Sequence, residues 1–344
     1  MGALVPLSTW QNPAKRRLEA IRAAHERDEE KLLELHHAYL VLKGRKRARL
    51  SPKTLALYQV AIRDYLAWAW PPGACGPKIE ILKATGDDLD RWVHDLETQG
   101  GHLNPNPSPL KPGSIATYLA AVRSFYRALA WAKAAELPQA RAPQDPTPAH
   151  ERRPALPLEL YQRLLAHLAH DEPQARRDRL AVRLMGEAGL RISEVVNLEL
   201  PEVHLEERLL EVTGKGGKRR SVPISRSLAE ELSAWLLVRR AHARPGDKHL
   251  LINLGERKGH GRGMTEKTLR ERLNRHYRTL GFPPRYYGAH LLRHTAGTRI
   301  YRKSRDLHAT ARLLGHANVN TSAIYAKMDM EGLFSLVDRL EEES

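Results

Sequence analysis

A proline-rich segment in the middle of the chain places the strongest constraint on its fold. Residues 138–157 contain six prolines, at positions 138, 143, 146, 148, 154 and 157. Proline has no backbone N–H and disfavours a helical conformation in the residue before it, so this segment cannot continue a helix or pair inside a sheet. We therefore predict an extended linker over 138–157. The 344 residues leave room for one ordinary domain on either side of it.

The residues before the linker predict a bundle of helices. Proline follows a capping residue at Ser51–Pro52, and apolar side chains then recur at helical spacing. Helices are expected over 52–69, 85–96 and 115–129. We expect residues 45–137 to form one small helical domain.

The first 44 residues differ in composition from the segment that follows them. A helix opens at Asn12–Pro13, but this stretch is heavily charged and has few apolar residues before Leu32. We therefore expect residues 1–44 to form a solvated or frayed helical extension rather than part of a core.

The residues after the linker predict a second domain, residues 158–330, that is mainly α-helical with a small antiparallel β-hairpin. Strand-like runs at 209–212 and 221–224 flank the turn Thr-Gly-Lys-Gly-Gly-Lys-Arg-Arg. Helical patterns precede the hairpin at 158–168 and 179–188 and fill most of the remainder. Residues 331–344 are expected to form an amphipathic helical tail.

The charge of the chain narrows the class of partner. Lys and Arg number 56 against 40 Asp and Glu, which gives a net charge of +16. Such an excess favours binding to a polyanion, and nucleic acid is the commonest one, although a basic surface can also serve solubility alone. Cys75 is the only cysteine, which excludes an internal disulfide and a cysteine-based zinc site. There is no apolar run of about 18 residues and no signal-peptide pattern, so we expect a cytoplasmic protein without a membrane partner.

Five short stretches in the last 160 residues carry residues suited to phosphoryl transfer. They are Gly-Leu-Arg-Ile-Ser-Glu, the Gly-Lys turn of the hairpin, His-Leu-Leu-Arg-His-Thr, Leu-Leu-Gly-His and a later tyrosine. The side chains concerned are Arg191, Glu194, Lys215, His290, Arg293, His316 and Tyr325. Phosphoryl transfer depends mainly on positioning and charge stabilisation, so these cations and one hydroxyl are chemically sufficient.

Each residue type suits one part of that chemistry. The guanidinium groups of Arg191 and Arg293 stay charged and match two phosphate oxygens. A lysine of lowered pKa can protonate a leaving oxygen, and Lys215 or Lys218 could serve. A phenol such as that of Tyr325 needs a base or nearby positive charge before it can attack. Glu194 either orients an arginine or is an ordinary surface carboxylate.

Other chemistries fit these residues less well. His290 and His294 are four apart, as in a zinc-protease helix, but Leu291 stands where the catalytic glutamate would be and Ile300 where a third ligand would be. The glycines at 214–217 lie in a hairpin and lack the P-loop spacing. We therefore expect no metal ion and no cofactor.

The ordered set resembles the tyrosine recombinase (phage integrase) family, whose pattern is Arg-x-x-Glu/Asp, a hairpin Lys, His-x-x-Arg, Leu-Gly-His and a nucleophilic Tyr. The intervals are also similar, with Arg191 24 positions before Lys215 and Arg293 23 positions before His316. The resemblance singles out Lys215 within the turn. Tyr325 also stands in the family's Thr-x-x-x-Tyr context.

The resemblance implies a two-domain clamp around double-stranded DNA, with a helical core-binding (SAM-like) domain and a catalytic domain. It implies strand cleavage through a 3′-phosphotyrosyl intermediate by a tetramer on two DNA sites, with or without a second recombinase, and association with the nucleoid. A C-terminal tail would dock on a neighbouring protomer or pack on its own domain. We expect further DNA contacts from Arg45, Lys46, Arg47, Lys218, Arg219 and Arg220.

Three other functions share part of this pattern. A type IB topoisomerase uses similar residues, but His290 ahead of Arg293 is typical of recombinases. A DNA-binding regulator could keep the fold without catalysis. A basic architectural protein would need none of these intervals. Within the family, dimer resolution, phage or plasmid integration and transposition use the same active site.

Overall fold

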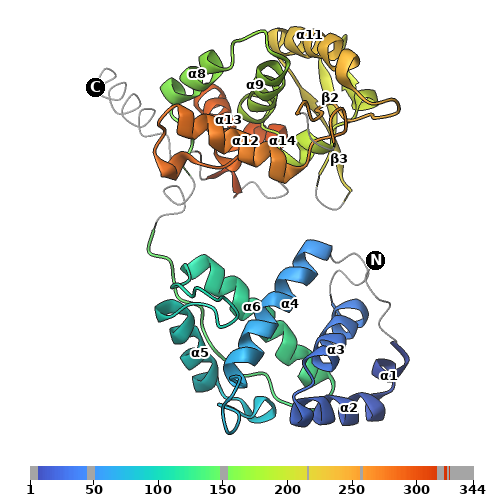
Figure 1. The fold of residues 1–344 in the computed structure, drawn as a ribbon, viewed down its shortest axis with the longest axis vertical. Coiled ribbons are helices and arrows are strands. Elements are labelled where there is room, and N and C mark those ends of the chain that lie inside the picture. The colour runs from blue at the N-terminus through green and yellow to red at the C-terminus, as the bar shows by residue number, and fades with distance from the viewer. Residues whose placement is uncertain are drawn as a thin grey trace, which may run out of the picture. The chain divides into compact units, whose positions relative to one another are not determined.

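The structure, a computed structural model, describes residues 7–44, 51–147, 154–214, 217–255, 259–315, 321–323 and 325. The chain forms two compact units, Met1–Pro146 and Thr147–Ser344, and the boundary between them in the sequence falls within the proline-rich segment (Figure 1). Both units are mainly helical, and one small antiparallel sheet is present in the described part of the chain. The predicted fold class is therefore confirmed.

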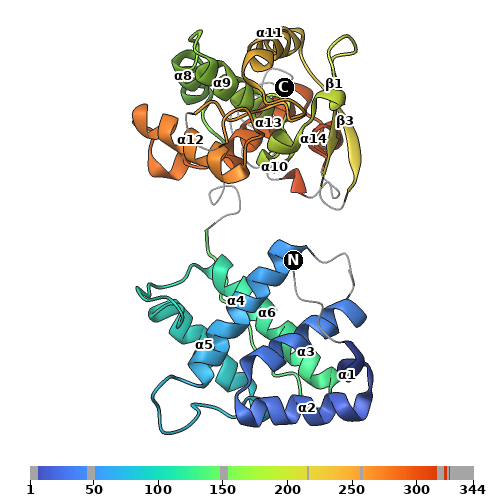
Figure 2. The same cartoon turned by 45° about the vertical axis from the view of Figure 1, so that its right-hand side comes forward.

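The first unit is a helical bundle whose helix starts follow the capping signals in the sequence. The side chain of Asn12 accepts backbone hydrogen bonds at the start of α2, and Thr85 and Asp88 form a reciprocal capping box at the start of α5. The helices are α1 (Leu7–Gln11), α2 (Pro13–Glu26), α3 (Glu29–Leu42), α4 (Pro52–Ala69), η2 (Ile81–Lys83), α5 (Gly86–Thr98) and α6 (Pro112–Trp131). Helices α4 and α6 pack side by side in both views (Figures 1 and 2).

The expectation that the first 44 residues lie outside a core is wrong. Trp10, Leu32 and Leu35 are fully buried in the same apolar cluster as Tyr65 and Phe125. Helix α3 packs against α2, α4 and α6. The composition predicted too little burial because much of the buried face of α2 is alanine, which lets helices approach closely. Charged residues cover the opposite side of the helix.

The second unit is built around α9 (Pro173–Gly186), which packs against α10, α11, α12 and α13. This helix starts earlier than the predicted residue 179, because Glu172 and Pro173 supply an N-cap and a proline in the first turn. The other helices are α8 (Leu158–His167), α10 (Ile192–Asn197), η3 (Leu200–Glu202), α11 (Arg226–His242), α12 (Glu266–Thr279), η4 (Pro284–Tyr286), α13 (His290–Ser304) and α14 (Leu307–Leu314).

The sheet of the second unit contains the predicted hairpin and one additional short strand. Strands β1 (Val203–His204), β2 (Leu209–Thr213) and β3 (Arg219–Pro223) pair antiparallel in the order β1-β2-β3. Leu210 pairs with Val222, and both point into the core together with Val212. The alternation of buried and exposed residues fixes the register of the hairpin and therefore the place of its turn.

No helix within the described ranges is long and apolar enough to span a membrane.

Candidate active site

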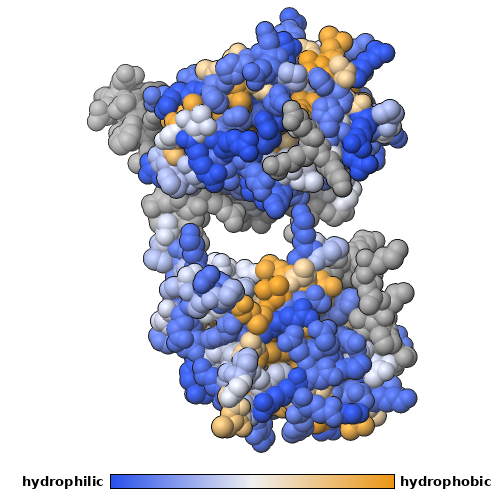
Figure 3. Space-filling view, in the orientation of Figure 1, coloured by the Kyte–Doolittle hydropathy of each residue, from blue (hydrophilic) through white to orange (hydrophobic). Residues whose placement is uncertain are grey.

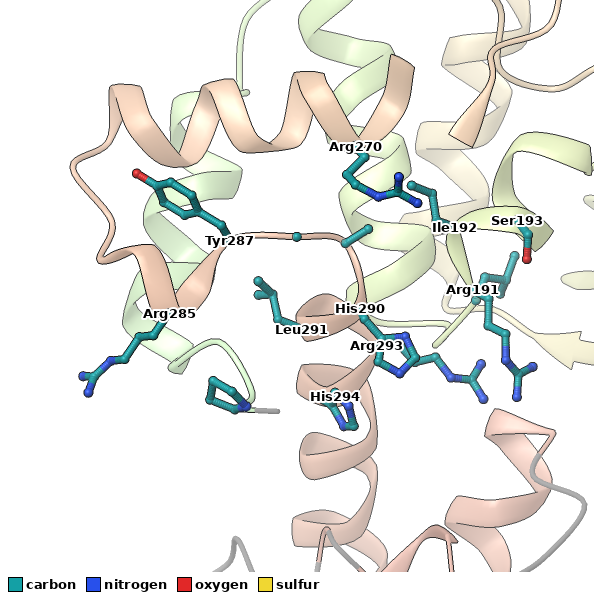
Figure 4. Close-up of a pocket in the computed structure, with 14 residues that line it drawn as sticks. Arg191, Ile192, Ser193, Arg270, Arg285, Tyr287, His290, Leu291, Arg293 and His294 are labelled. Atoms are coloured by element: carbon teal, nitrogen blue, oxygen red, sulfur yellow. The ribbon is translucent and has the colours of Figure 1, made fainter. Parts of the chain in front are cut away.

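A cleft of about 460 Å³ in the second unit brings together motif residues that lie about a hundred positions apart in the sequence. Arg191 and Ser193 line it from the start of α10, and His290, Arg293 and His294 line it from α13. Figure 4 shows the side chains of Arg191 and Arg293 extending side by side next to the His290 ring. The structure thus joins the Arg-x-x-Glu and His-x-x-Arg motifs in one site.

Glu194 is the centre of a group of arginines, which we call the Glu194 cluster (Arg191, Glu194, Arg220 and Arg293). Glu194 is buried, and its carboxylate accepts from the backbone N–H and the guanidinium of Arg191, both at 2.8 Å. It also accepts two hydrogen bonds from Arg220, at 2.8 and 3.0 Å, and lies 3.8 Å from Arg293. Burial alone would raise the pKa of Glu194, but the hydrogen bonds from Arg220 and Arg191 lower it below its ordinary value.

Arg293 is held by backbone oxygens from two other segments. Its side chain is buried, and it donates to the carbonyl oxygens of Gly189 and Leu314. Burial and, to a smaller extent, the neighbouring charge of Arg191 lower the pKa of Arg293 to about 10. The group remains a cation at neutral pH, in a site where little water screens its charge.

Three arginine charges against one carboxylate leave the Glu194 cluster with two excess positive charges. Arg191 is the most exposed of the three, with about a third of its side chain accessible, and it faces the cleft. Preorganised cations in a partly desolvated cleft are suited to an anion that carries two oxygens, such as a phosphodiester.

Tyr325 packs on the helix that carries Arg293. It is 2% exposed, and its ring lies directly over Gly297 of α13, where an added Cβ would come within 2.2 Å of the ring carbon Cζ. Burial raises the pKa of Tyr325, whereas the positive charges of Arg293 and Arg191 act in the opposite direction. The phenol is therefore neutral at pH 7 and lies within the field of both arginines.

The two histidines of α13 line the cleft, and one of them is also next to the tyrosine. The His290 ring contacts the His294 ring at a centroid distance of 4.9 Å, and the His294 ring lies 5.8 Å from that of Tyr325. His290 is exposed in the cleft, whereas His294 is buried. In the parts of the chain that the structure describes, no group of three or more His, Cys, Asp or Glu residues is placed to hold a metal ion.

The remaining predicted site residues fall into two groups. Lys215, His316, Arg45, Lys46, Arg47 and the tail 331–344 lie outside the described residues. Lys218 and Arg219 are exposed next to the hairpin turn. Arg220, which follows them, turns inward to Glu194 instead.

The cleft also contains residues that the sequence did not single out. Arg270 of α12, Arg285 of η4 and Tyr287 line it together with the motif residues (Figure 4). No motif marks these positions among the 56 basic residues, so only the packing of α12 against α10 reveals Arg270.

Most of the surface in view in Figure 3 is hydrophilic, in keeping with the charge of the chain.

Comparisons with known proteins identify the family of the chain. The model of the phage integrase family matches residues 155–331, and that of the phage integrase N-terminal SAM-like domain matches residues 45–133. Tyrosine recombinase XerC 1 of Ralstonia nicotianae is 33% identical over 313 residues, which cover 85% of this chain and 88% of the relative. Tyrosine recombinase XerC of Azotobacter vinelandii is 36% identical over 234 residues, covering 66% and 73%.

Solved structures share the fold at lower identity. The XerH site-specific recombinase bound to a palindromic difH substrate has a TM-score of 0.66 at 18% identity, covering 97% of this chain and 96% of that one. A lambda integrase dimer bound to a COC′ core site has a TM-score of 0.60 at 17% identity, covering 86% and 94%. The family matches and the similarity to the XerC recombinases show that the chain belongs to the phage integrase family of tyrosine recombinases.

Proposed function

We propose that this tyrosine-type site-specific DNA recombinase cleaves and rejoins double-stranded DNA through a covalent bond between Tyr325 and a 3′-phosphate. The observation that carries the proposal is the Glu194 cluster, which has two excess positive charges and places Arg191 and Arg293 in one cleft. Tyr325 packs on the helix that carries Arg293 and lies within the field of both arginines. DNA-bound recombinases such as XerH and lambda integrase share the fold, which supports DNA as the partner.

In the proposed reaction, the oxygen of Tyr325 attacks the scissile phosphorus and the bond to the 5′-oxygen breaks. Arg191 and Arg293 bind the non-bridging oxygens, whose negative charge grows in the transition state. The phenolic proton passes to a histidine, for which His290 and His316 are the candidates, and Lys215 protonates the leaving 5′-oxygen.

Rejoining is the reverse transfer. A 5′-hydroxyl from the partner duplex attacks the phosphotyrosine and gives its proton to Lys215. The bond to Tyr325 breaks, and the phenol takes back the proton held by the histidine. The phosphodiester energy is kept in the covalent intermediate, so the residues named here complete the reaction without ATP. Four protomers on two DNA sites would exchange strands in pairs, with or without a second recombinase. Such a protein would act in the cytoplasm, on the nucleoid.

The first test is a search for the covalent intermediate. Wild-type protein, Tyr325→Phe and Tyr301→Phe are incubated with nicked duplexes made from the host genome and then denatured. Tyr301 is the matched control, because it packs against the same small cluster as Tyr325 without belonging to the proposed machinery. We expect adducts with the wild type and with Tyr301→Phe and none with Tyr325→Phe, and sequencing of the trapped DNA identifies the recombination site.

Two outcomes would contradict the proposal. Tight DNA binding with no adduct from any of the three proteins would indicate a non-catalytic regulator. Adducts scattered over many unrelated sequences, with no exchange of partner strands, would indicate a topoisomerase activity.

A further inference from the structure

Arg220 differs from the two basic residues that precede it in the hairpin. Lys218 and Arg219 are exposed, whereas 17% of the Arg220 side chain is accessible. Both terminal nitrogens of its guanidinium donate to the Glu194 carboxylate, at 2.8 and 3.0 Å. A bidentate pair of this kind fixes the guanidinium in a plane, which a lysine ammonium cannot reproduce. Arg220 is thus committed to a protein carboxylate.

Gly214, at the base of the hairpin turn, lies close to this pair. Gly214 immediately precedes Lys215, and a Cβ at Gly214 would lie 3.5 Å from Oε1 of Glu194 and 3.6 Å from Nη1 of Arg220. The backbone N–H of Gly214 donates to the carbonyl oxygen of Lys218 at 2.7 Å, which closes the base of the turn. A single carbon added to Gly214, the last described residue before Lys215, would therefore already touch the Arg220–Glu194 pair.

The other side of Arg220 contacts the Leu-Gly-His motif. Gly315 ends α14 with a positive φ of 64°, and a Cβ there would come within 2.5 Å of Nε and 2.9 Å of Cζ of Arg220. Glycine is required at this position both for the backbone angle and for the close approach of the guanidinium. Because His316 follows Gly315 directly, Arg220 lies between the residues that precede Lys215 and His316.

We propose that Arg220 is a positioning residue that holds the hairpin lysine in register with the arginines of the cleft. Through Glu194 its guanidinium is tied to Arg191 and Arg293. It also lies close to Gly214 and Gly315, the residues that directly precede Lys215 and His316. This inference rests on the proposed function, in which Lys215 is the general acid. It assigns Arg220 a role in leaving-group protonation that acts through another residue.

The test compares two leaving groups. A nicked duplex carrying the recombination site is prepared with the ordinary 5′-oxygen at the scissile bond and, separately, with sulfur in its place. A thiolate leaves without protonation, because a thiol has a pKa of about 8.5 and an alkoxide is far more basic. Single-turnover adduct formation is measured at saturating protein for the wild type, Lys215→Ala, Arg220→Gln, Arg191→Gln and the control Arg226→Gln.

We expect Arg220→Gln to cleave the oxygen substrate roughly 100-fold more slowly than the wild type, since displacement of a catalytic group by about 1 Å costs on that order. The sulfur substrate should restore most of that loss, as it should for Lys215→Ala. Arg191→Gln should remain slow on both substrates, because it removes a contact to the phosphate itself. Arg226→Gln, an exposed arginine just beyond β3, is the matched control and should cleave both substrates at the wild-type rate.

Two results would overturn the inference. One is an Arg220→Gln defect of equal size on both substrates, which would mean that Arg220 acts on the phosphate or only on the fold. The other is wild-type cleavage of both substrates by Arg220→Gln. If Arg220→Gln does not fold, as judged by thermal unfolding, Arg220→Lys is assessed by the same two rates. Failure of the wild type itself to form an adduct would refute the proposed function and this inference together, whereas the two results above leave the function intact.

Discussion

Two buried carboxylates of the second unit, Asp178 and Glu194, each gather several cations, yet they differ in what those cations can reach. Asp178 lies on α9 in what we call the Asp178 cluster (Arg177, Asp178, Arg272 and His276). Arg177 donates to it at 2.7 and 2.9 Å, Arg272 at 2.7 Å, and His276 lies at 2.9 Å. Arg177 is 2% exposed and also donates to the carbonyl oxygen of Ile252.

The Asp178 cluster connects α9 to α12 and to the segment around Ile252, and none of its members lines the cleft that holds Arg191 and Arg293. The Glu194 cluster also joins separate segments, but Arg191 and Arg293 face that cleft. The comparison shows that a buried arginine–carboxylate group does not by itself mark a functional site. The distinguishing feature is an excess of charge directed into an accessible space.

The largest expected effect tests the structural role of the Asp178 cluster. Asp178→Asn should lower the free energy of unfolding by about 3–5 kcal/mol, because it leaves buried cations without their counter-charge. Cleavage per folded molecule should be unchanged. Urea unfolding of the wild type and the variant measures the first quantity, and adduct formation measures the second; a folded variant that cleaves slowly would show that the two clusters are not separate in function.

Asp178 also makes the stability of the fold depend on pH. Burial would raise the pKa of Asp178, but His276, Arg177 and Arg272 hold it well below its ordinary value. A depressed folded pKa contributes stability that is fully present above the unfolded value of about 3.9 and is lost as the pH falls from there toward the folded value. The difference in stability between the wild type and Asp178→Asn should therefore be largest near pH 7 and smaller at pH 3, as measured by urea unfolding at both.

The next prediction compares an arginine-to-lysine substitution in each of the two clusters. Arg293→Lys should slow cleavage roughly 100-fold or more, because a lysine cannot hold both backbone carbonyls and a phosphate in the transition state. Arg177→Lys is the matched control, which should lose stability and keep its cleavage rate once folded. Single-turnover adduct formation on folded protein distinguishes them, and equal rates for the two variants would abolish the contrast between the clusters.

A smaller effect concerns two glycines with nearly the same backbone conformation. Gly315 lies against the Glu194 cluster with a φ of 64°, and Gly281 follows α12 with a φ of 66° and nothing within 4 Å of an added Cβ. Alanine at either site should cost about 1 kcal/mol for the left-handed conformation. Only Gly315→Ala should also slow cleavage, by about tenfold, because its Cβ displaces Arg220. Thermal unfolding and adduct rates are measured for both alanine variants. Equal cleavage rates would show that a Cβ at Gly315 does not displace Arg220.

The smallest effect is on the salt dependence of DNA binding. Arg191→Gln should reduce the slope of log Kd against log salt by about 0.9, the value for one phosphate contact, whereas Arg272→Gln should leave it unchanged. Titrations between about 50 and 200 mM salt measure both slopes. A wild-type slope near zero would be incompatible with the electrostatic part of the proposal.

The motifs and most of the helices could be predicted from local signals. Asn12, Thr85 and the prolines mark helix starts, the alternation of apolar residues marks β2 and β3, and the prolines at 138–157 mark the division into two units. These features depend on neighbouring residues, so a sequence contains them directly. The charged composition of residues 1–44 gave the wrong expectation because burial of alanine and leucine faces depends on what packs against them.

The sequence by itself determined which residues are chemically able to act, since the identity and order of residues belong to the covalent structure of the chain. These residues are Arg191, His290, Arg293 and Tyr325. Only the tertiary structure decided which of many basic residues share a site. The pairing of Glu194 with Arg220 across 26 positions, the approach of Tyr325 to Gly297 and the entry of Arg270 into the cleft all follow from packing around α9 and α13. Such contacts leave no signal in the neighbouring sequence. The sequence around a charged residue does not reveal whether its side chain is paired with water, a buried carboxylate or a phosphate.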